Sequence, residues 1–357
     1  MINIRKEQKI KIPTTYIEYL EPNYIFIPIK ENTSFSKVPI KKNDIIEKIK
    51  VPIDGNILAT AVNGKNEYLI IKNNKKRENL VKNEMTLPLI KDKIDYKFNS
   101  FFQDKKILYV NAFDKDPSCF NNYYLLDKEE DKILAVFNFL IDNNSVHEIR
   151  IVVPATYETL IKKYQKLDNK NIKLTIVNDY FSLGYKDILS KYLRIRQNDI
   201  VSLNEIINLY YELKSESNNY LYITISGDIK NCVIKVLKYT ILKEVLEYLN
   251  ININEVTINL NSSLITKKGA YQQVLTEEIE LIMVNKKEII EEIVEEKITI
   301  KRDLKKKMED ECFNCGLCYM MCPWHFNPLR KQKCRECGLC SYLCPSKKVL
   351  KIGENNE

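Results

Sequence analysis

The chain has 357 residues, of which 45% are hydrophobic and 29% are charged, a balance typical of globular proteins. This length exceeds what one hydrophobic core usually supports, which predicts several domains. The sequence contains no run of about 18 apolar residues and no apolar signal segment at its start, so no membrane-spanning helix is expected. The net charge of +8 is spread over many lysines without a nucleic-acid-binding motif, so a nucleic-acid partner is not expected.

The first 75 residues have the pattern of short strands separated by turns. Strands are predicted at the apolar runs 24–29, 51–59 and 67–72. Many short strands without helices are typical of a small barrel or sandwich. We therefore predict a small β barrel or sandwich over 1–75. Residues 76–104 are polar and irregular, which is typical of a linker.

Strand and helix patterns alternate over residues 105–214. Buried strands are predicted at 107–111, 148–153 and 172–177. Apolar residues at helical spacing predict helices at 128–143, 156–167, 185–192 and 203–213. Strands that alternate with helices favour a parallel sheet with helices packed against it. This segment is therefore predicted to be an α/β, Rossmann-like domain.

The pattern changes again after residue 214. Residues 220–226 alternate as a strand and end at a Gly-Asp turn. A second strand, a helix and a third strand are expected at 233–236, 241–249 and 255–260. These elements predict a compact unit over 215–265. Residues 266–310 are rich in Glu, Ile and Lys near their end, which favours a connector with a helix leading into the last domain.

Eight of the ten cysteines lie in the last predicted domain, residues 311–357, in two copies of the spacing C-x2-C-x2-C-x3-C-P. The candidate metal ligands are Cys312, Cys315, Cys318, Cys322, Cys334, Cys337, Cys340 and Cys344. Three thiolates on a tight loop can bind three corners of an iron–sulfur cube, whereas the fourth is turned away from it. Gly316 and Gly338 stand between the second and third ligands, where a missing Cβ lets the backbone approach the cluster. The tail is thus predicted to hold two [4Fe–4S] clusters, as in bacterial two-cluster ferredoxins.

Other uses of these cysteines fit the pattern less well. A zinc site with four cysteine ligands needs only two C-x2-C pairs and would leave four cysteines without a role. A disulfide framework is typical of short secreted chains. Clusters of this kind need a reducing compartment, which favours the cytoplasm of an anaerobe. The two cysteines outside the motifs, Cys119 and Cys232, have apolar neighbours and are predicted to be small core residues.

If the tail folds as two-cluster ferredoxins do, each motif gives its fourth cysteine to the other cluster. One cluster would then be held by Cys312, Cys315, Cys318 and Cys344. The other would be held by Cys334, Cys337, Cys340 and Cys322. Together with the preceding units, this tail predicts a multidomain α+β protein.

The order of these pieces resembles RnfC-like proteins, meaning the peripheral RnfC component of the Rnf electron-transport complex and its soluble relatives. Residues 51–55 (VPIDG) resemble the SPVSG segment of the family's N-terminal barrel. Residues 109–117 (YVNAFDKDP) resemble its NGAECEP segment, which is similar to NADESEPG in the flavin- and NADH-binding subunit of respiratory complex I. Residues 224–228 (TISGD) resemble the TVTGD strand that opens a soluble-ligand-binding β-grasp domain. With the cysteine tail, the resemblance spans nearly the whole chain and implies a β-grasp unit at 215–265.

One part of the family's pattern is missing. Members that bind FMN and NADH carry a glycine-rich loop, of the kind G-x-G-G-x-G-F-P, whose backbone N–H groups cradle phosphate. Residues 65–183 contain no glycine. The resemblance implies that Asn111, Asp114 and Asp116 face a flavin or ribose, whereas the alternative is an ordinary turn at the end of a strand. Because the phosphate half of the site is missing, we favour the turn, expect no tightly bound FMN, and interpret the α/β domain as a docking platform.

Two classes of function follow from these features. In the first, the protein is an electron-transfer subunit that relays electrons through two [4Fe–4S] clusters between a redox carrier or flavoprotein and a partner subunit. In the second, it is a complete NADH- or FMN-dependent oxidoreductase with an atypical flavin site in the α/β domain. A third alternative is an adaptor whose clusters only stabilise its fold.

The first class implies a redox protein partner such as a ferredoxin, a flavoprotein or Rnf-type subunits. It implies a cytoplasmic location, with peripheral membrane association through partner subunits. No catalytic residue is predicted. Bound flavin that NADH bleaches would distinguish the second class from the first.

Overall fold

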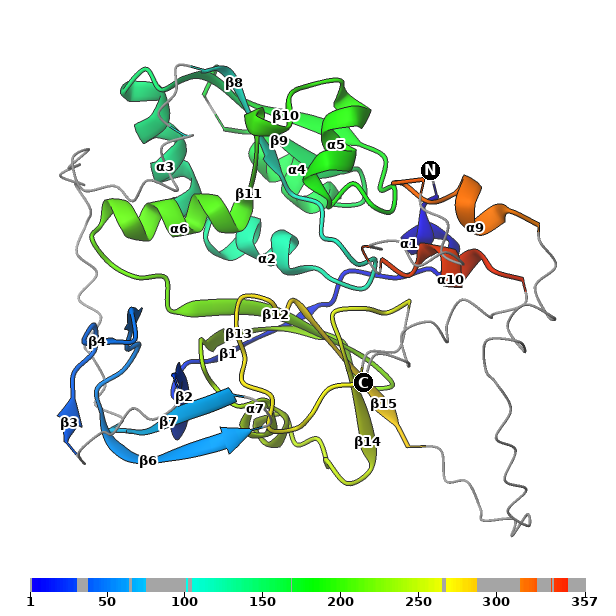
Figure 1. Cartoon of the computed structure of the whole chain (residues 1–357). Helices are drawn as coiled ribbons and strands as arrows, with labels where there is room; N and C mark the ends of the chain where they lie inside the picture. Colours follow the sequence, from blue (N-terminus) through cyan, green and yellow to red (C-terminus); the bar gives the residue numbers. More distant parts are fainter. Residues whose placement is uncertain are drawn as a thin grey trace, which may run out of the picture.

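A computed structural model of the chain describes residues 2–30, 38–63, 66–74, 101, 105–167, 169–264, 268–287, 315–325, 335 and 337–345. These residues form a mixed α/β structure with several sheets, one of them parallel and one curled into a half-barrel (Figure 1). No helix within these ranges is long and apolar enough to cross a membrane. Apart from Phe101, the predicted linker 76–104 lies outside the described residues, as does the helix predicted to lead into the cysteine motifs.

The segment predicted to be an α/β domain contains a four-stranded parallel sheet in the order β10-β9-β8-β11. Its strands are β8 (Lys105–Asn111), β9 (Val146–Pro154), β10 (Ile172–Val177) and β11 (Ile200–Ser202). Leu108 and Val110 of β8 and Ile149 and Ile151 of β9 are completely buried, as expected for strands that helices cover. The pairing confirms the parallel sheet predicted from the alternation of strands and helices.

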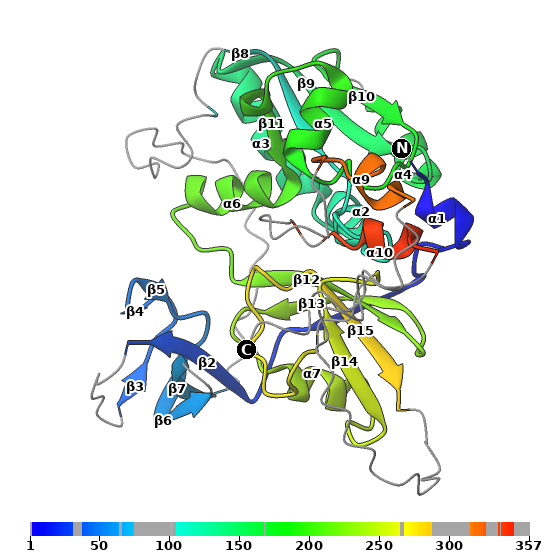
Figure 2. The same ribbon diagram turned by 45° about the vertical axis from the view of Figure 1, so that its right-hand side comes forward.

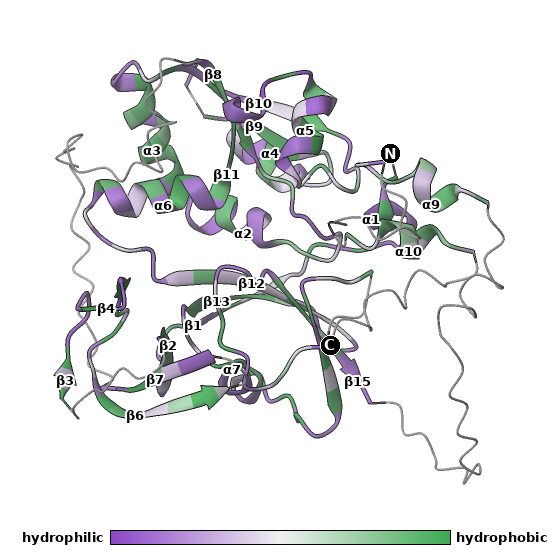
Figure 3. Ribbon diagram, viewed as in Figure 1, coloured by the Kyte–Doolittle hydropathy of each residue, from purple (hydrophilic) through white to green (hydrophobic). Residues whose placement is uncertain are grey.

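The helices of this sheet are α2 (Asn121–Lys128), α3 (Glu130–Asp142), α4 (Glu158–Tyr164), α5 (Lys186–Leu193) and α6 (Leu203–Leu213). The helix α6 begins at a capping box, in which Ser202 and Glu205 satisfy each other's backbone N–H groups. Figure 3 shows α6 banded with hydrophobic and hydrophilic residues, the pattern from which its bounds were predicted. The sequence pattern did not predict α2.

A second sheet has five strands in the order β1-β13-β12-β15-β14, with helix α7 (Leu242–Tyr248) packed against it. Its strands are β1 (Thr15–Tyr19), β12 (Tyr220–Gly227), β13 (Cys232–Leu237), β14 (Val256–Leu260) and β15 (Leu281–Lys286). The strand β1 pairs in parallel with β13, and β15 pairs in parallel with β12. Sequence analysis predicted neither of them. The domain boundaries stay predictions, but β1 joins residues 15–19 to a sheet outside the predicted N-terminal unit.

The half-barrel consists of the four antiparallel strands β2-β7-β6-β3, with a two-stranded ribbon beside it. The strands are β2 (Tyr24–Ile29), β3 (Pro39–Ile40), β4 (Ile45–Ile46), β5 (Ile49–Lys50), β6 (Gly55–Asn63) and β7 (Asn66–Asn73). Its core includes Ile25, Ile27, Leu69 and Ile71, all completely buried. The strands predicted at 24–29 and 67–72 are confirmed. The strand predicted at 51–59 begins only at Gly55, because Pro52 lacks the N–H that a strand ladder needs.

Candidate functional site

The described parts of the two cysteine motifs have the same local structure. In the first, Gly316 precedes helix α9 (Leu317–Met320), and in the second, Gly338 precedes helix α10 (Leu339–Leu343). Both glycines have positive φ angles, 71° and 78°, which ordinary side chains disfavour. No described atom lies within 4 Å of a Cβ built on Gly316. In the described structure, backbone conformation rather than crowding therefore explains the glycine.

The described residues include six of the eight predicted cluster ligands. The first cysteine of each motif, Cys312 or Cys334, lies outside them. Within the described ranges, no group of three His, Cys, Asp or Glu side chains is arranged to hold a metal ion. The donor set fits iron–sulfur chemistry, because every predicted ligand is a thiol, and the described second and third ligands of each motif flank a glycine with the same backbone conformation. The eight-ligand assignment therefore remains a prediction from the sequence.

The cysteine tail, which we define as the described residues 315–325, 335 and 337–345, is held to the parallel sheet through Asp187 in the first turn of α5. Trp324, two residues after the first motif's last cysteine, donates from its indole Nε1 to Asp187 Oδ2 at 2.7 Å. Arg335 of the second motif reaches the same oxygen at 3.4 Å. The Trp324 ring also meets Tyr185 edge-on, with 4.9 Å between ring centroids. One carboxylate thus binds Trp324, which directly follows the first motif, and Arg335 within the second motif.

A second contact of the tail is with the N-terminal helix α1 (Ile4–Glu7). Figures 1 and 2 both place α9 and α10 beside α1. Ile4 packs in a buried cluster with Phe181, Leu264 and Leu339, the first residue of α10. The Tyr342 hydroxyl donates to Glu7 Oε2 at 2.9 Å. The tail therefore rests on α1 as well as on α5.

Asn111 ends β8 at the carboxyl edge of the parallel sheet, and the structure gives each of its amide atoms a partner. Its Nδ2 donates to the carbonyls of Leu183 and Gly184, at 3.1 and 3.3 Å. Its Oδ1 accepts from the backbone N–H of Phe113 at 3.0 Å. Asn111 therefore ties the loop after β8 to the loop after β10.

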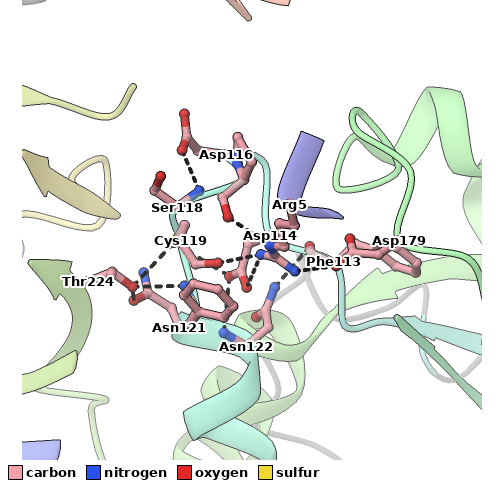
Figure 4. Close-up of polar contacts among 12 residues, drawn as sticks. Arg5, Phe113, Asp114, Asp116, Ser118, Cys119, Asn121, Asn122, Asp179 and Thr224 are labelled. Carbon is pink, nitrogen blue, oxygen red and sulfur yellow. Dashed lines mark hydrogen bonds and ion pairs between the residues drawn. The ribbon is translucent and has the colours of Figure 1, made fainter. Parts of the chain in front are cut away.

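The side chain of Asp114, in the same loop, is 4% exposed and lies beside Arg5 (Figure 4). Its Oδ1 accepts from the backbone N–H of Asn122 at 3.1 Å, and its Oδ2 accepts from the Tyr157 hydroxyl at 3.0 Å. Burial raises the pKa of Asp114 to about 7, although the nearby Arg5 guanidinium acts in the opposite direction. This carboxyl group is therefore partly protonated near neutral pH.

Asp116 is buried as well, with both carboxylate oxygens in use. Its Oδ1 accepts from the backbone N–H of Ser118 at 2.8 Å and from the Ser263 hydroxyl at 2.6 Å. Its Oδ2 accepts from the backbone N–H of Ser263 at 2.8 Å. Burial raises the pKa of Asp116, and these hydrogen bonds lower it in part. The first bond closes an Asx turn, and the other two join the loop to residues near the second sheet.

Arg5 of α1 is the central cation of this region, and its side chain is 5% exposed. Its guanidinium donates to the carbonyls of Pro117 and Cys119, at 2.7 and 2.5 Å, and to Asp179 Oδ2 at 3.0 Å. The guanidinium carbon lies 4.4 Å from the centre of the Phe120 ring. Burial lowers the pKa of Arg5, but the neighbouring acidic groups raise it more, so Arg5 stays protonated.

The same loop is bonded to the second sheet through Thr224 of β12. The Thr224 hydroxyl donates to Asn121 Oδ1 at 2.9 Å and accepts from the backbone N–H of Phe120 at 2.9 Å. Two segments singled out in the sequence, 109–117 and 224–228, are thus close together in space. Cys119 is 1% exposed between them, and Cys232 is 4% exposed in β13, which confirms both as core residues.

The predicted flavin residues do not fit a flavin in this structure. Asn111, Asp114 and Asp116 are brought to one edge, but within the described residues their polar atoms are already bonded to protein groups. The hollow beside them, lined in part by Ile4, Arg5 and Asp179, has room for about one water molecule. Small-molecule sites typically need roughly 300 Å³ or more. We therefore derive no chemical step through FMN.

Sequence reasoning missed the residues that organise this edge: Arg5, Tyr157, Asp179 and Asp187. Arg5 lies in a short polar N-terminal stretch without any motif. Asp179 follows a predicted strand, and Asp187 lies in the first turn of a predicted helix. The only available signal was that polar residues after parallel strands gather at one edge of a sheet.

No family model matches the chain, and no curated protein matches it. Among solved structures, similar chains include two from an NAD+-reducing [NiFe]-hydrogenase, in the H2-reduced and the air-oxidized states. Each has a TM-score of 0.46 and 10% sequence identity, and they cover 66% and 64% of this chain. This chain spans about half, 47%, of the matched chains. A similarity of this degree carries no argument about function.

Proposed function

We propose that this protein is an electron-transfer iron–sulfur protein whose C-terminal tail holds two [4Fe–4S] clusters. The observation that carries the proposal is the duplicated C-x2-C-x2-C-x3-C-P motif. The like-folded turns at Gly316 and Gly338 support it, because they give the second and third cysteines of each motif the same local setting. Such clusters accept and release single electrons, which suits a relay between a redox carrier or flavoprotein and a partner subunit.

The residues proposed to hold the clusters are shared between the motifs. The first set is Cys312, Cys315, Cys318 and Cys344. The second set is Cys334, Cys337, Cys340 and Cys322. When bound, the clusters would supply the electron-carrying iron. The chain's own part is to present thiolates from two turns and to hold both motifs against α5 through Asp187.

The finer parts of this proposal concern architecture and partners. The strand order β13-β12-β15-β14, with α7 between β13 and β14 in the chain, supports the β-grasp interpretation of residues 215–265, extended to include β15. We propose an RnfC-like role, in which a redox protein partner delivers or takes electrons at the tail in the cytoplasm. The cysteine motifs and the order of the domains support this role.

Iron and sulfide analysis tests the proposal directly. Protein purified without oxygen should contain about 8 iron and about 8 sulfide per chain. Cys322→Ala should perturb the paramagnetic spectrum of the second set, as Cys337→Ala does, whereas Cys344→Ala should resemble Cys315→Ala. The matched control is Cys232→Ala, a buried cysteine outside the motifs, which should leave the iron content unchanged.

Other outcomes would contradict separate parts of the proposal. About one zinc per chain without sulfide would overturn the cluster assignment. A Cys322→Ala spectrum that matches that of Cys315→Ala would show that each motif binds its own cluster. Stoichiometric flavin released by acid would replace the relay with the oxidoreductase alternative.

A further inference from the structure

The order of the parallel sheet defines where a ligand would be expected. From β8 the chain proceeds to β9 and β10 on one side, and then crosses to β11 on the other side. In open parallel sheets, ligands bind outside the carboxyl ends of the strands at the point where this order reverses. Here that point is the pair of strand ends Asn111 and Ser202, which are partners in the β8–β11 register.

Beside that point, the loops after β8 and β10 approach each other closely across a crevice. A Cβ added to Gly184, in the loop after β10, would collide with the backbone carbonyl of Asp114, in the loop after β8. Asn111 joins the same two loops through its bonds to Leu183 and Gly184. Gly184 therefore permits a backbone-to-backbone contact across the crevice, instead of opening a cradle for phosphate.

The charge of the crevice also opposes a nucleotide. Asp114, Asp116 and Asp179 all line the hollow, and each of these carboxyl groups repels a phosphate when it is ionised. The Arg5 guanidinium lies among these acidic groups: it is paired with Asp179 and lies 3.8 Å from Asp114. An acidic crevice suits a guanidinium, because its planar donors can satisfy several acceptors at once.

The segment that carries Arg5 is attached on both sides of that side chain. Before it, the Ile2 carbonyl accepts from the backbone N–H of Phe181 at 2.8 Å. Within it, Ile4 is 1% exposed and packs against Leu339 of the cysteine tail. After it, Glu7 accepts from Tyr342. The same few residues thus contact the crevice on one side and the tail on the other.

We propose that residues 2–7 are a built-in occupant of the carboxyl edge of the parallel sheet: Arg5 binds the loop after β8, one of the two strands at the point where the order reverses, and the segment forms a seat for the cysteine tail. The crevice then binds no nucleotide, and the α/β domain holds the tail instead. This role belongs to the polypeptide itself and does not require the clusters. It goes beyond the electron-transfer role, because it assigns to residues 2–7 a place at the edge where such sheets bind ligands.

The thiol of Cys119 provides a direct measure of crevice closure. Cys119 is buried, and its carbonyl accepts from Arg5, so loss of the guanidinium should open its surroundings. In full-length protein as purified, maleimide labelling of Cys119 and Cys232 would be followed by peptide mass spectrometry. In Arg5→Ala, Cys119 should be labelled at least about tenfold faster than in wild type, because the buried carboxylate of Asp179 loses the Arg5 guanidinium. Cys232, also buried, is the internal reference and should be unchanged.

Three further variants separate the steps of the inference. Arg196→Ala removes an exposed arginine paired with Asp199, and the labelling rate of Cys119 in this variant should equal that of wild type. Arg5→Lys keeps the charge but cannot reach all three acceptors, so it should give intermediate labelling even if Arg5→Ala fails to fold. Glu7→Gln should speed hydrogen exchange in residues 337–345 and leave Cys119 labelling unchanged.

Nucleotide exclusion is tested on the wild-type protein with FMN and with NADH at millimolar concentration. Neither should slow hydrogen exchange in residues 112–122 or the labelling of Cys119. Saturable protection of this loop by either nucleotide would overturn the proposal. Wild-type labelling of Cys119 in both Arg5 variants would also overturn it. None of these measurements depends on iron, so they can fail or succeed separately from the electron-transfer proposal.

Discussion

Replacing Asp187 by alanine should release the cysteine tail from the parallel sheet. Asp187 Oδ2 accepts from Trp324 Nε1 at 2.7 Å, and its side chain is 20% exposed. A hydrogen bond to a charged group contributes about 1.5–3 kcal/mol. Arg335 is 55% exposed at 3.4 Å from the same oxygen, so its contribution is discounted to about 0.5 kcal/mol or less. We therefore expect a loss of about 2 kcal/mol, or about a 30-fold higher equilibrium constant for tail opening.

Trp324 is the only tryptophan in the chain, so its fluorescence reports on tail docking alone. In metal-free protein, Asp187→Ala should shift the emission to longer wavelength and increase quenching by acrylamide, because the indole loses its bond and its contact with Tyr185. Asp187→Asn keeps an acceptor oxygen without the charge and should give a smaller change. Asp199→Ala removes a carboxylate paired with Arg196 and is the matched control.

The reasoning would be refuted if Asp187→Ala kept the wild-type emission and quenching. A change of equal size in Asp199→Ala would refute it as well, because the effect would then be a general loosening of the domain. Hydrogen exchange of residues 337–345 provides a second measurement. It should rise in Asp187→Ala, since the Arg335 contact tethers the second motif to the same carboxylate.

Two further predictions concern single residues. Gly338→Ala should destabilise the second motif by about 1–2 kcal/mol, because the φ of 78° at this position suits glycine. Gly338→Asn should destabilise it less, because asparagine tolerates positive φ better than alanine. Equal iron retention in both variants and in wild type would contradict this prediction. Burial raises the pKa of Asp114 to about 7 in the folded state, above about 3.9 in the unfolded chain, so the unfolding free energy should fall as pH rises from about 4 to 7. In Asp114→Asn, the difference in unfolding free energy between pH 4 and pH 7, measured by denaturant titration, should shrink by an amount on the order of a few kcal/mol. An unchanged difference would argue against this reasoning.

Local sequence patterns predicted the elements whose signals are local. The apolar spacing within α6 predicted its bounds, 203–213, because that spacing depends only on residues within a few turns. The strand–helix alternation predicted the parallel sheet for the same reason. The cysteine spacing likewise determined the predicted ligands, since a motif that binds a cluster carries its geometry in consecutive residues.

Contacts between distant segments were decided only by the tertiary structure. Arg5 bonds to Pro117, Cys119 and Asp179, at sequence separations of 112, 114 and 174 residues. No periodicity or motif encodes such pairs, because they arise when folding brings separate loops to one edge of the sheet. The pairing of β1 with β13 is of the same kind.

The acidic residues after β8 show the division most clearly. From the sequence, Asn111, Asp114 and Asp116 had two interpretations, a flavin site or a turn. The residue types showed that polar groups would lie at the end of a strand. The neighbouring sequence could not determine which residues would bond to them. The structure supplies Arg5, Tyr157 and Ser263 as their neighbours. A buried carboxyl group must be bonded or neutralised, so its partners, which come from elsewhere in the chain, decide its role.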